Sequence, residues 1–282
     1  MNAIEIKDLK KVYDGFTLGG LNLNLPSGYI MGLIGENGAG KSTLIKLVLG
    51  MLHADGGSVK ILGADNDKEA AKVREEVGVV LDNVGFPECM NVHKINRIMR
   101  SVYKNWDEEK FFCYVDRFSI PKEKEYKEYS RGMRMKIGIA VALSHNPRIL
   151  IFDEATNGLD PAARDDVNNI LNEFTRDEQN SVFISSHIVS DLERICDYIV
   201  FIHKGKLMIC EEKDRLRDEY AIVQCSETDF RKIPSDMVYG AKINDYGVEA
   251  AVKKSAVPSG LRTVPISIEE LFVHMIKEAD RK

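Results

Sequence analysis

Residues 35–43 read Gly35-Glu36-Asn37-Gly38-Ala39-Gly40-Lys41-Ser42-Thr43. The run fits the pattern G-x-x-x-x-G-K-[ST], with an apolar run at 29–34 before it and a helical pattern at 42–52 after it. Glycines let the backbone fold around an anion, and the N-terminus of the following helix adds free N–H donors. The nine residues therefore form a predicted nucleotide-binding loop, in which Lys41 reaches the β- and γ-phosphates and Ser42 is a ligand of Mg²⁺.

An acidic pair follows a second apolar run. Residues 149–152 are all apolar, and Asp153 and Glu154 come directly after them. A parallel strand delivers its carboxyl end to the ligand crevice of the sheet. We therefore expect Asp153 to hold Mg²⁺ and Glu154 to orient or deprotonate an attacking water. An acidic turn at a strand end is common by itself, and it is the phosphate loop that gives this pair a catalytic interpretation.

The overall composition is that of a globular protein. The chain has 282 residues, 44% of them hydrophobic, and a formal net charge of −5. This composition excludes dominant disorder, and the acidic balance disfavours nucleic acid as a partner. No apolar run approaches the length of about 20 residues that a membrane helix needs, and the N-terminus lacks the pattern of a signal peptide. Five scattered cysteines without a C-x-x-C motif indicate reduced thiols. These features predict a soluble cytosolic protein.

The character of the chain changes along its length. Residues before 84 are rich in strand patterns, and residues 84–147 are mostly helical, including a helix that we expect Asn105 to cap. Strand and helix then alternate up to residue 215, which favours a mostly parallel sheet covered on both faces. Residues 216–282 hold short strand-like runs and a final helix from about Ser267. We expect one domain at 1–215, with a helical subdomain at 84–147, and a small accessory domain at 216–282.

Further motifs make the pattern specific. They are Tyr13, Tyr129-Ser130-Arg131-Gly132-Met133, Asn157-Gly158-Leu159-Asp160-Pro161 and Ser185-Ser186-His187. Together with the phosphate loop and the acidic pair, in this order and spacing, they resemble the ABC-type ATPases. The resemblance covers residues 3–215. It implies an α/β fold of the P-loop type, with a mostly parallel sheet, an N-terminal antiparallel β part and a helical subdomain, followed here by a small C-terminal α+β extension.

The resemblance also implies how the residues act. Two ATPase domains would pair head to tail, and ATP would lie between the phosphate loop of one and Ser130, Arg131 and Gly132 of the other. Ser130 begins a helix, so its hydroxyl and the helix N-terminus together suit an anion. Tyr13 would stack on adenine, and His187 would contact the γ-phosphate. We expect the remaining histidines to be structural: His53, His93, His145, His203 and His274.

The sequence departs from the family pattern at three positions. Arg131 stands where a glycine is usual, and its charge either strengthens ATP clamping by a partner or faces solvent. Asp82, followed by Asn83, stands where a glutamine normally touches Mg²⁺ and the membrane partner, and we expect Asp82 to remain a Mg²⁺ ligand. Ala155 replaces a usual proline, with little expected effect.

These features predict the ATP-hydrolysing subunit of an ABC transporter of an exporter-like bacterial branch. A separate membrane-spanning subunit would dock on the helical subdomain, and the second ATPase domain would make a homodimer or a heterodimer. The chain would then lie in the cytoplasm at the inner face of the cell membrane. One alternative is a soluble ABC-type ATPase that acts on DNA or the ribosome, and another is a nucleotide-gated regulatory module with little turnover.

Overall fold

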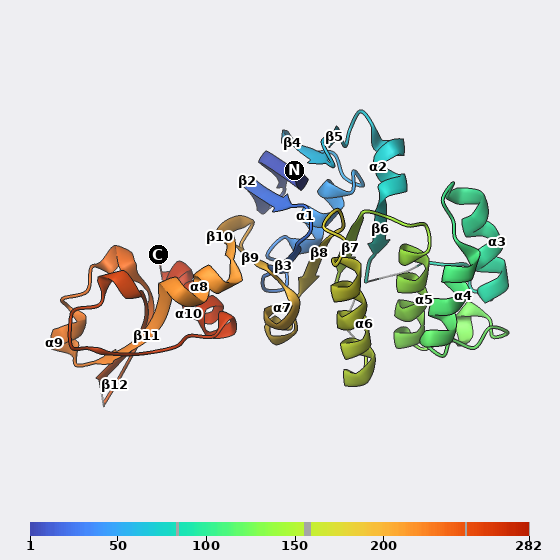
Figure 1. Ribbon diagram of the computed structural model, residues 1–282. Coiled ribbons are helices and arrows are strands. Elements are labelled where there is room, and N and C mark those ends of the chain that lie inside the picture. Colours follow the sequence, from blue (N-terminus) through green and yellow to red (C-terminus); the bar gives the residue numbers. More distant parts are fainter. Residues whose placement is uncertain (83–84, 155–158, 246, 282) are drawn as a thin grey trace.

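Three β-sheets and the helices around them make up the described part of the chain in the computed structural model (Figure 1). The described residues are 1–82, 85–154, 159–245 and 247–281. The positions Asn83, Ala155, Asn157 and Gly158, which the sequence singled out, lie outside these ranges. Among the described residues, none of the helices is both long enough and apolar enough to cross a membrane.

The first sheet is antiparallel and has the strand order β2-β1-β4-β5. Its strands are β1 (Asn2–Tyr13), β2 (Phe16–Pro26), β4 (Gly56–Ile61) and β5 (Ala64–Asp65). In β2 the leucines at 21, 23 and 25 are buried and the asparagines between them are exposed, so the alternation in the sequence marks the two faces of the strand. This sheet is the antiparallel N-terminal part that the family resemblance implies.

The central sheet has the order β10-β9-β3-β8-β7-β6, and every pairing in it is parallel except that of β10 with β9. Its strands are β3 (Ile30–Ile34), β6 (Val77–Val80), β7 (Ile149–Asp153), β8 (Ser181–Ser186), β9 (Tyr198–His203) and β10 (Lys206–Glu212). Helices near the sheet are α1 (Lys41–Val48), α2 (Ala70–Glu76), α6 (Pro161–Phe174) and α7 (Val189–Ile195). Strands β3 and β7 are buried at every position, as their continuous apolar runs predict.

A helical block packs beyond β6. It consists of α3 (Val92–Val102), α4 (Glu108–Arg117) and α5 (Arg131–Leu143). The side chain of Ser130 caps α5 by accepting a hydrogen bond from the Met133 amide, as predicted. The predicted cap Asn105 is wrong, because Asp107 accepts from the Lys110 amide at 2.9 Å and α4 begins only after it.

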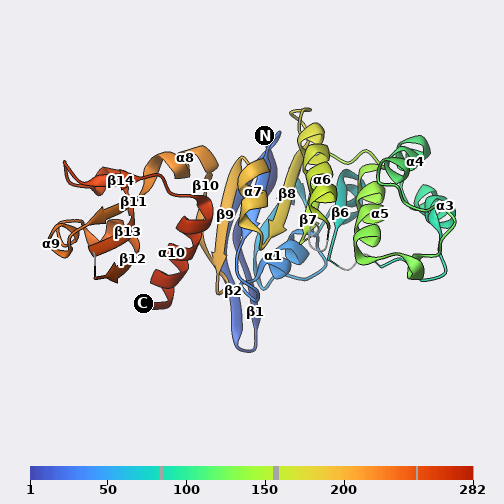
Figure 2. The same ribbon diagram turned by 90° about the horizontal axis from the view of Figure 1, so that it is seen from below.

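The C-terminal part contains an antiparallel sheet with the order β12-β13-β11-β14. Its elements are α8 (Lys213–Glu219), β11 (Tyr220–Cys225), α9 (Glu227–Phe230), β12 (Val238–Asn244), β13 (Gly247–Lys253), β14 (Arg262–Val264) and α10 (Ile268–Arg281). Figure 2 shows α10 running alongside β9 and β10, between this sheet and the central sheet. The rings of Phe272 on α10 and Phe201 on β9 are 5.0 Å apart. Leu271 and Met275 belong to the same buried cluster as Leu192 on α7. The C-terminal part therefore shares a hydrophobic core with the central sheet.

The architecture confirms the predicted α/β fold, with its mostly parallel sheet, antiparallel N-terminal sheet, helical block and C-terminal α+β part. The two faces of the central sheet contribute to two separate cores, one shared with α1 and the N-terminal sheet and the other with the helical block, α6 and α7. The carboxyl end of β3, where the phosphate loop begins, is thus held from both faces.

Candidate nucleotide site

The phosphate loop connects β3 to α1 and closes around the side chain of Lys41. The Lys41 ammonium is buried and donates to the carbonyls of Gly35 at 2.7 Å and Glu36 at 3.2 Å. Gly40, which precedes α1, has φ 110°, and a Cβ there would lie 2.7 Å from the Leu18 side chain. Only glycine fits both this dihedral and this space, and that explains why the motif has a glycine at position 40.

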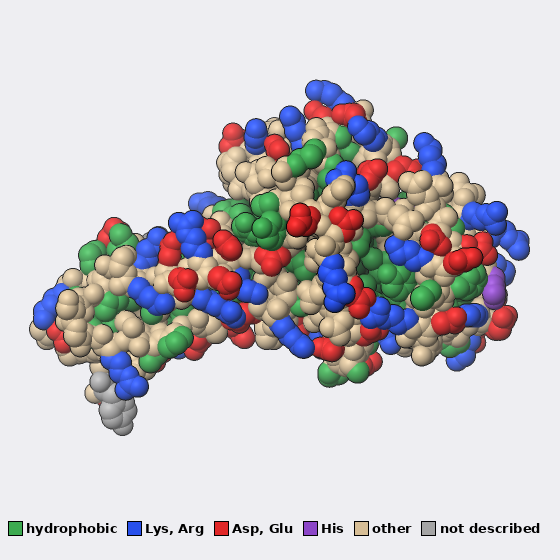
Figure 3. All heavy atoms as spheres, viewed as in Figure 1, with side chains coloured by type: hydrophobic (Ala, Val, Ile, Leu, Met, Phe, Trp, Pro, Cys, Tyr) green, Lys and Arg blue, Asp and Glu red, His purple; other side chains and the backbone are tan. Residues whose placement is uncertain are grey.

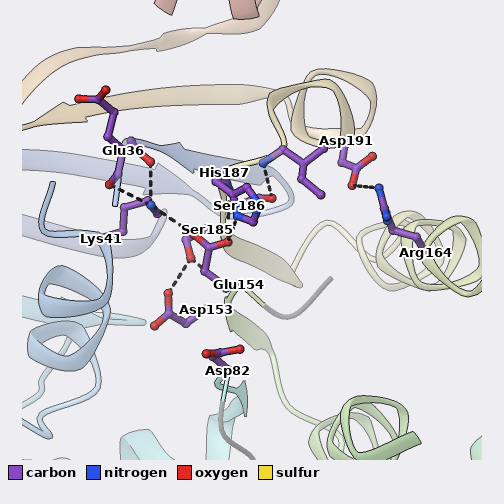
Figure 4. A network of polar contacts seen from close by, with 12 residues as sticks. Glu36, Lys41, Asp82, Asp153, Glu154, Arg164, Ser185, Ser186, His187 and Asp191 are labelled. Carbon is purple, nitrogen blue, oxygen red and sulfur yellow. Dashed lines mark hydrogen bonds and ion pairs between the residues drawn. The ribbon is translucent and has the colours of Figure 1, made fainter. Parts of the chain in front are cut away.

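Glu154 faces Lys41 from the end of β7. Its Oε1 lies 3.2 Å from the Lys41 Nζ, and its Oε2 lies 2.8 Å from Nδ1 of His187 (Figure 4). Glu154 has φ 54°, a left-handed conformation that costs roughly 1–3 kcal/mol in a non-glycine residue. Its amide donates to the backbone oxygen of Ser185 at 3.2 Å and to the hydroxyl of the same residue at 3.1 Å, which supports this turn. The three predicted catalytic residues therefore lie together.

The charge state of Glu154 follows from these contacts. Burial by itself raises the pKa of the Glu154 carboxyl, but the hydrogen bond with His187 and the charge of Lys41 together hold the pKa below its ordinary value. At neutral pH the side chain is thus a carboxylate, the form that orients or accepts a proton from water.

Asp153, the predicted Mg²⁺ ligand, is buried and held by one neighbour. The Ser185 hydroxyl donates to its Oδ1 at 2.7 Å, and the two residues are paired in register across β7 and β8. Ser185 therefore touches both acidic residues, although the motif Ser185-Ser186-His187 predicts a role for His187 alone. The signal that could have found it is its position at the end of a buried strand, two residues before His187.

A cavity of about 450 Å³ lies in front of these groups. It is lined by Tyr13, Phe16, Glu36, Asn37, Gly38, Gly40, Lys41, Ser42, Thr43, Asp82, Glu154 and His187. The lining unites the proposed adenine-stacking, phosphate-binding and catalytic positions in one chain, and Phe16, 6.5 Å from Tyr13 between ring centres, adds an aromatic that sequence reasoning missed. Ser130, Arg131 and Gly132 at the start of α5 are not among its lining residues.

The donor set suits Mg²⁺ carried by a nucleotide. Within the described residues there is no cluster of three or more His, Cys, Asp or Glu side chains that could hold a metal ion alone. Mg²⁺ is commonly held by one or two carboxylates together with substrate phosphates, so Asp153 and the Ser42 hydroxyl fit that role beside a phosphate loop. Figure 4 places Asp82 below Asp153, on the side of the site away from Glu36.

The two charged departures from the family pattern contact each other. An Arg131 Nη2 donates to Asp82 Oδ1 at 2.5 Å, which links the start of α5 to the residue after β6. Their side chains are 60% and 46% exposed, so the pair is open to solvent. Asp82 as a Mg²⁺ ligand and Arg131 as a contact to a partner's phosphate both stay predictions.

The pair is expected to make a measurable but small contribution to stability. Asp82→Asn and Arg131→Gln should each change the free energy of unfolding by at most ~1 kcal/mol, because exposed ion pairs contribute little. In a double-mutant cycle by urea denaturation, the two changes should be less than additive. Strict additivity would mean that the two side chains do not interact in solution.

The chain is similar to known proteins over the region that carries these motifs. The family model described as ABC transporter matches residues 18–157. The chain is 31% identical over 279 residues to the uncharacterized ABC transporter ATP-binding protein YhcH of Bacillus subtilis (strain 168), covering 98% of this chain and 90% of that protein. It is 32% identical over 209 residues to the bacitracin transport ATP-binding protein BcrA of Enterococcus faecalis, covering 73% and 68%.

The chain belongs to the ABC transporter family. It is an ATP-binding and ATP-hydrolysing subunit of that family, as the sequence predicted. A solved structure of an ATP-binding subunit of an ABC transporter superposes on this ABC subunit with a TM-score of 0.71 and 26% identity, covering 76% of this chain and 92% of that one.

Proposed function

We propose that this ABC subunit drives transport through a separate membrane-spanning subunit, at the inner face of the cell membrane and paired with a second ATPase domain. The observation that carries the proposal is the division of the site: the phosphate loop and Glu154 line one cavity, whereas Ser130 and Gly132 lie outside it. A second copy or a related domain would supply such an anion-binding helix start to this cavity. The bacitracin transport protein among the relatives supports a role in transport.

In this proposal each residue of the site has one task. The loop amides and Lys41 bind the phosphates of ATP, while Ser42 and Asp153 hold Mg²⁺, which supplies positive charge at the phosphates when bound. Glu154 orients the attacking water and accepts its proton, because it is charged and fixed by the turn at Ser185. His187 contacts the γ-phosphate end of the site.

An apolar groove suits the membrane-spanning partner. It has a volume of about 470 Å³ and lies beside the edge strand β6, lined by Leu49, Met51, Ile61, Ala71, Val73, Arg74, Glu75, Val77, Val79, Val102 and Tyr103. Met51 and Val102 are each 57% exposed at this groove. Exposed apolar side chains gathered in a groove mark a protein contact. Strand β6 runs from the groove towards Asp82 in the nucleotide cavity, so a partner seated there has a direct route to the site.

The charges on the face of the molecule seen in Figure 3 do not point to a particular partner. Acidic and basic side chains are interspersed over that face, with no large area of one sign. A nucleic-acid partner would favour a basic field. The proposal of a membrane-spanning partner therefore rests on the groove and on the family of the chain. Charge attraction contributes little to this proposal.

Met51→Glu tests the groove. A charge placed in this mostly apolar groove is expected to abolish co-purification with the membrane-spanning subunit, because burying a carboxylate among apolar side chains is costly. ATP binding by the isolated subunit should persist. The matched control is Ile243→Glu on β12, a position 65% exposed and outside the groove, which should leave co-purification intact. A Met51→Glu subunit that still co-purifies would overturn the docking site.

A further inference from the structure

His203 lies between two carboxylates that come from opposite ends of the chain. It is the last residue of β9 and is only 6% exposed. Its Nδ1 lies 3.2 Å from Glu36 Oε2, and its Nε2 lies 3.0 Å from Asp280 Oδ1. Glu36 is the second residue of the phosphate loop, and Asp280 is near the end of α10. One buried ring thus connects the C-terminal helix to the nucleotide site.

The turn after His203 also supports the loop. The Gly205 amide donates to the carbonyl of Ala39, in the middle of the phosphate loop, at 2.9 Å. Gly205 has φ 77°, and a Cβ there would lie 2.0 Å from the Thr17 carbonyl oxygen, so this turn is held tightly in place. A shift of His203 or of its turn would therefore be passed to the loop through two contacts, one at Glu36 and one at Ala39.

The position of Asp280 is not explained by the stability of α10. A negative charge near the C-terminus of a helix is unfavourable, because the helix dipole is negative there. Asp280 accepts instead from outside the helix, from Lys204 at 2.6 Å and from His203. These hydrogen bonds lower the pKa of the Asp280 carboxyl and keep it charged. The residue is placed to contact the end of β9.

Helix α10 is fixed firmly enough to position a distant side chain. Leu271, Phe272 and Met275 are buried against β9 and α7 in the shared core. The Ile268 amide at the start of the helix donates to Glu193 of α7 at 3.4 Å. Because both its start and its middle are anchored, the end of the helix delivers Asp280 to a defined point.

We propose that α10 is a positioning element for nucleotide binding: Asp280 orients the His203 ring, and His203 with its turn holds the phosphate loop in its binding shape. His203 and Asp280 are positioning residues, since they act through Glu36 and Ala39. The contact of Nε2 with Asp280 fixes the plane of the ring, and with it the place of the Nδ1 edge beside Glu36. The inference rests on the proposed role of the loop in binding ATP, and it needs no membrane partner.

The variant Asp280→Asn tests whether Asp280 acts by positioning His203 or only by its negative charge near the phosphate site. Removing a carboxylate near a phosphate site would by charge alone tighten ATP binding, whereas loss of positioning weakens it. With radiolabelled ATP and the full chain in equilibrium dialysis, we expect the Kd to rise about two- to fivefold, the range of a partly exposed ion pair. His203→Gln should give a similar rise, and the double variant should be no worse than the larger single effect. The matched control is Glu269→Gln, an exposed acid in the first turn of α10, which should keep the Kd unchanged.

Hydrogen exchange provides the second measurement. Amides of residues 35–41 should exchange faster in Asp280→Asn than in the unaltered chain, and this arm decides the question if His203→Gln fails to fold. An unchanged or lower Kd for Asp280→Asn, unchanged exchange in the loop, or effects of the two variants that multiply would each overturn the proposal. If Lys41→Ala left ATP binding intact, the loop itself would not be the binding site, which is a separate failure.

Discussion

Replacing Glu154 with Gln is expected to reduce ATP turnover by about 10²- to 10⁴-fold, the contribution of a positioned general base. The amide keeps the size of the side chain but cannot accept the proton of the attacking water. ATP binding should persist, because Lys41 and the loop amides are unchanged. Since bound ATP is no longer consumed, a pair of ATPase domains should accumulate, and size-exclusion chromatography with ATP should detect it.

The control for this variant is Glu109→Gln on α4, an exposed acid of the helical block. It should hydrolyse ATP at the rate of the unaltered chain. Hydrolysis by Glu154→Gln at the unaltered rate would refute the role of Glu154, whereas loss of turnover without the larger species would refute the pairing and leave the chemistry in place.

Lys41→Ala should weaken ATP binding by roughly 100-fold or more, because a charged donor to phosphate typically contributes about 1.5–3 kcal/mol per hydrogen bond. The substitution also removes the 3.2 Å ion pair with Glu154, which keeps its contact with His187, so a small loss of stability is expected. The measurement is equilibrium dialysis with radiolabelled ATP, together with thermal unfolding followed by circular dichroism.

A double variant separates these two effects of Lys41. In Lys41→Ala with Glu154→Gln, the carboxylate that lost its Lys41 partner is removed as well, so stability should recover while ATP affinity stays low. Recovery of ATP affinity in the double variant would show that Lys41 acts on stability and not on phosphate. ATP binding by the single variant at the unaltered affinity would also contradict the assignment.

The sequence predicted the parts of this molecule that local rules determine. The phosphate loop is contiguous, and the positive φ angles of Gly38 and Gly40 are a local requirement for glycine that the sequence pattern carries. The apolar runs at 29–34 and 149–152 predicted buried parallel strands, because only a strand covered on both faces is apolar throughout. Ser130 was recognised as a cap for the same reason: its hydroxyl bonds an amide three residues away.

Other features depend on packing between distant segments and could not be predicted. The contact between Asp82 and Arg131 joins residues 49 positions apart, and it exists only because α5 packs against the edge strand β6. His203 was expected to be merely structural, since its contact Asp280 lies 77 positions away on another element. The cap of α4 is Asp107 and not Asn105, and the chain just before it is held by distant segments: the Trp106 indole donates to Asn96 at 2.8 Å and the Asp107 amide donates to the Ser144 carbonyl at 2.7 Å.

The shared core of α10 has a consequence for the synthesis of the chain. Phe201 on β9 is synthesised well before Phe272 on α10, the side chain that packs on it. Until then the side of β9 that α10 covers presents apolar surface to the cell, a condition that favours chaperone binding or misassembly. Expression boundaries drawn at residue 215 would make this transient exposure permanent, so a fragment intended to isolate the ATPase would carry the surface that α10 normally covers.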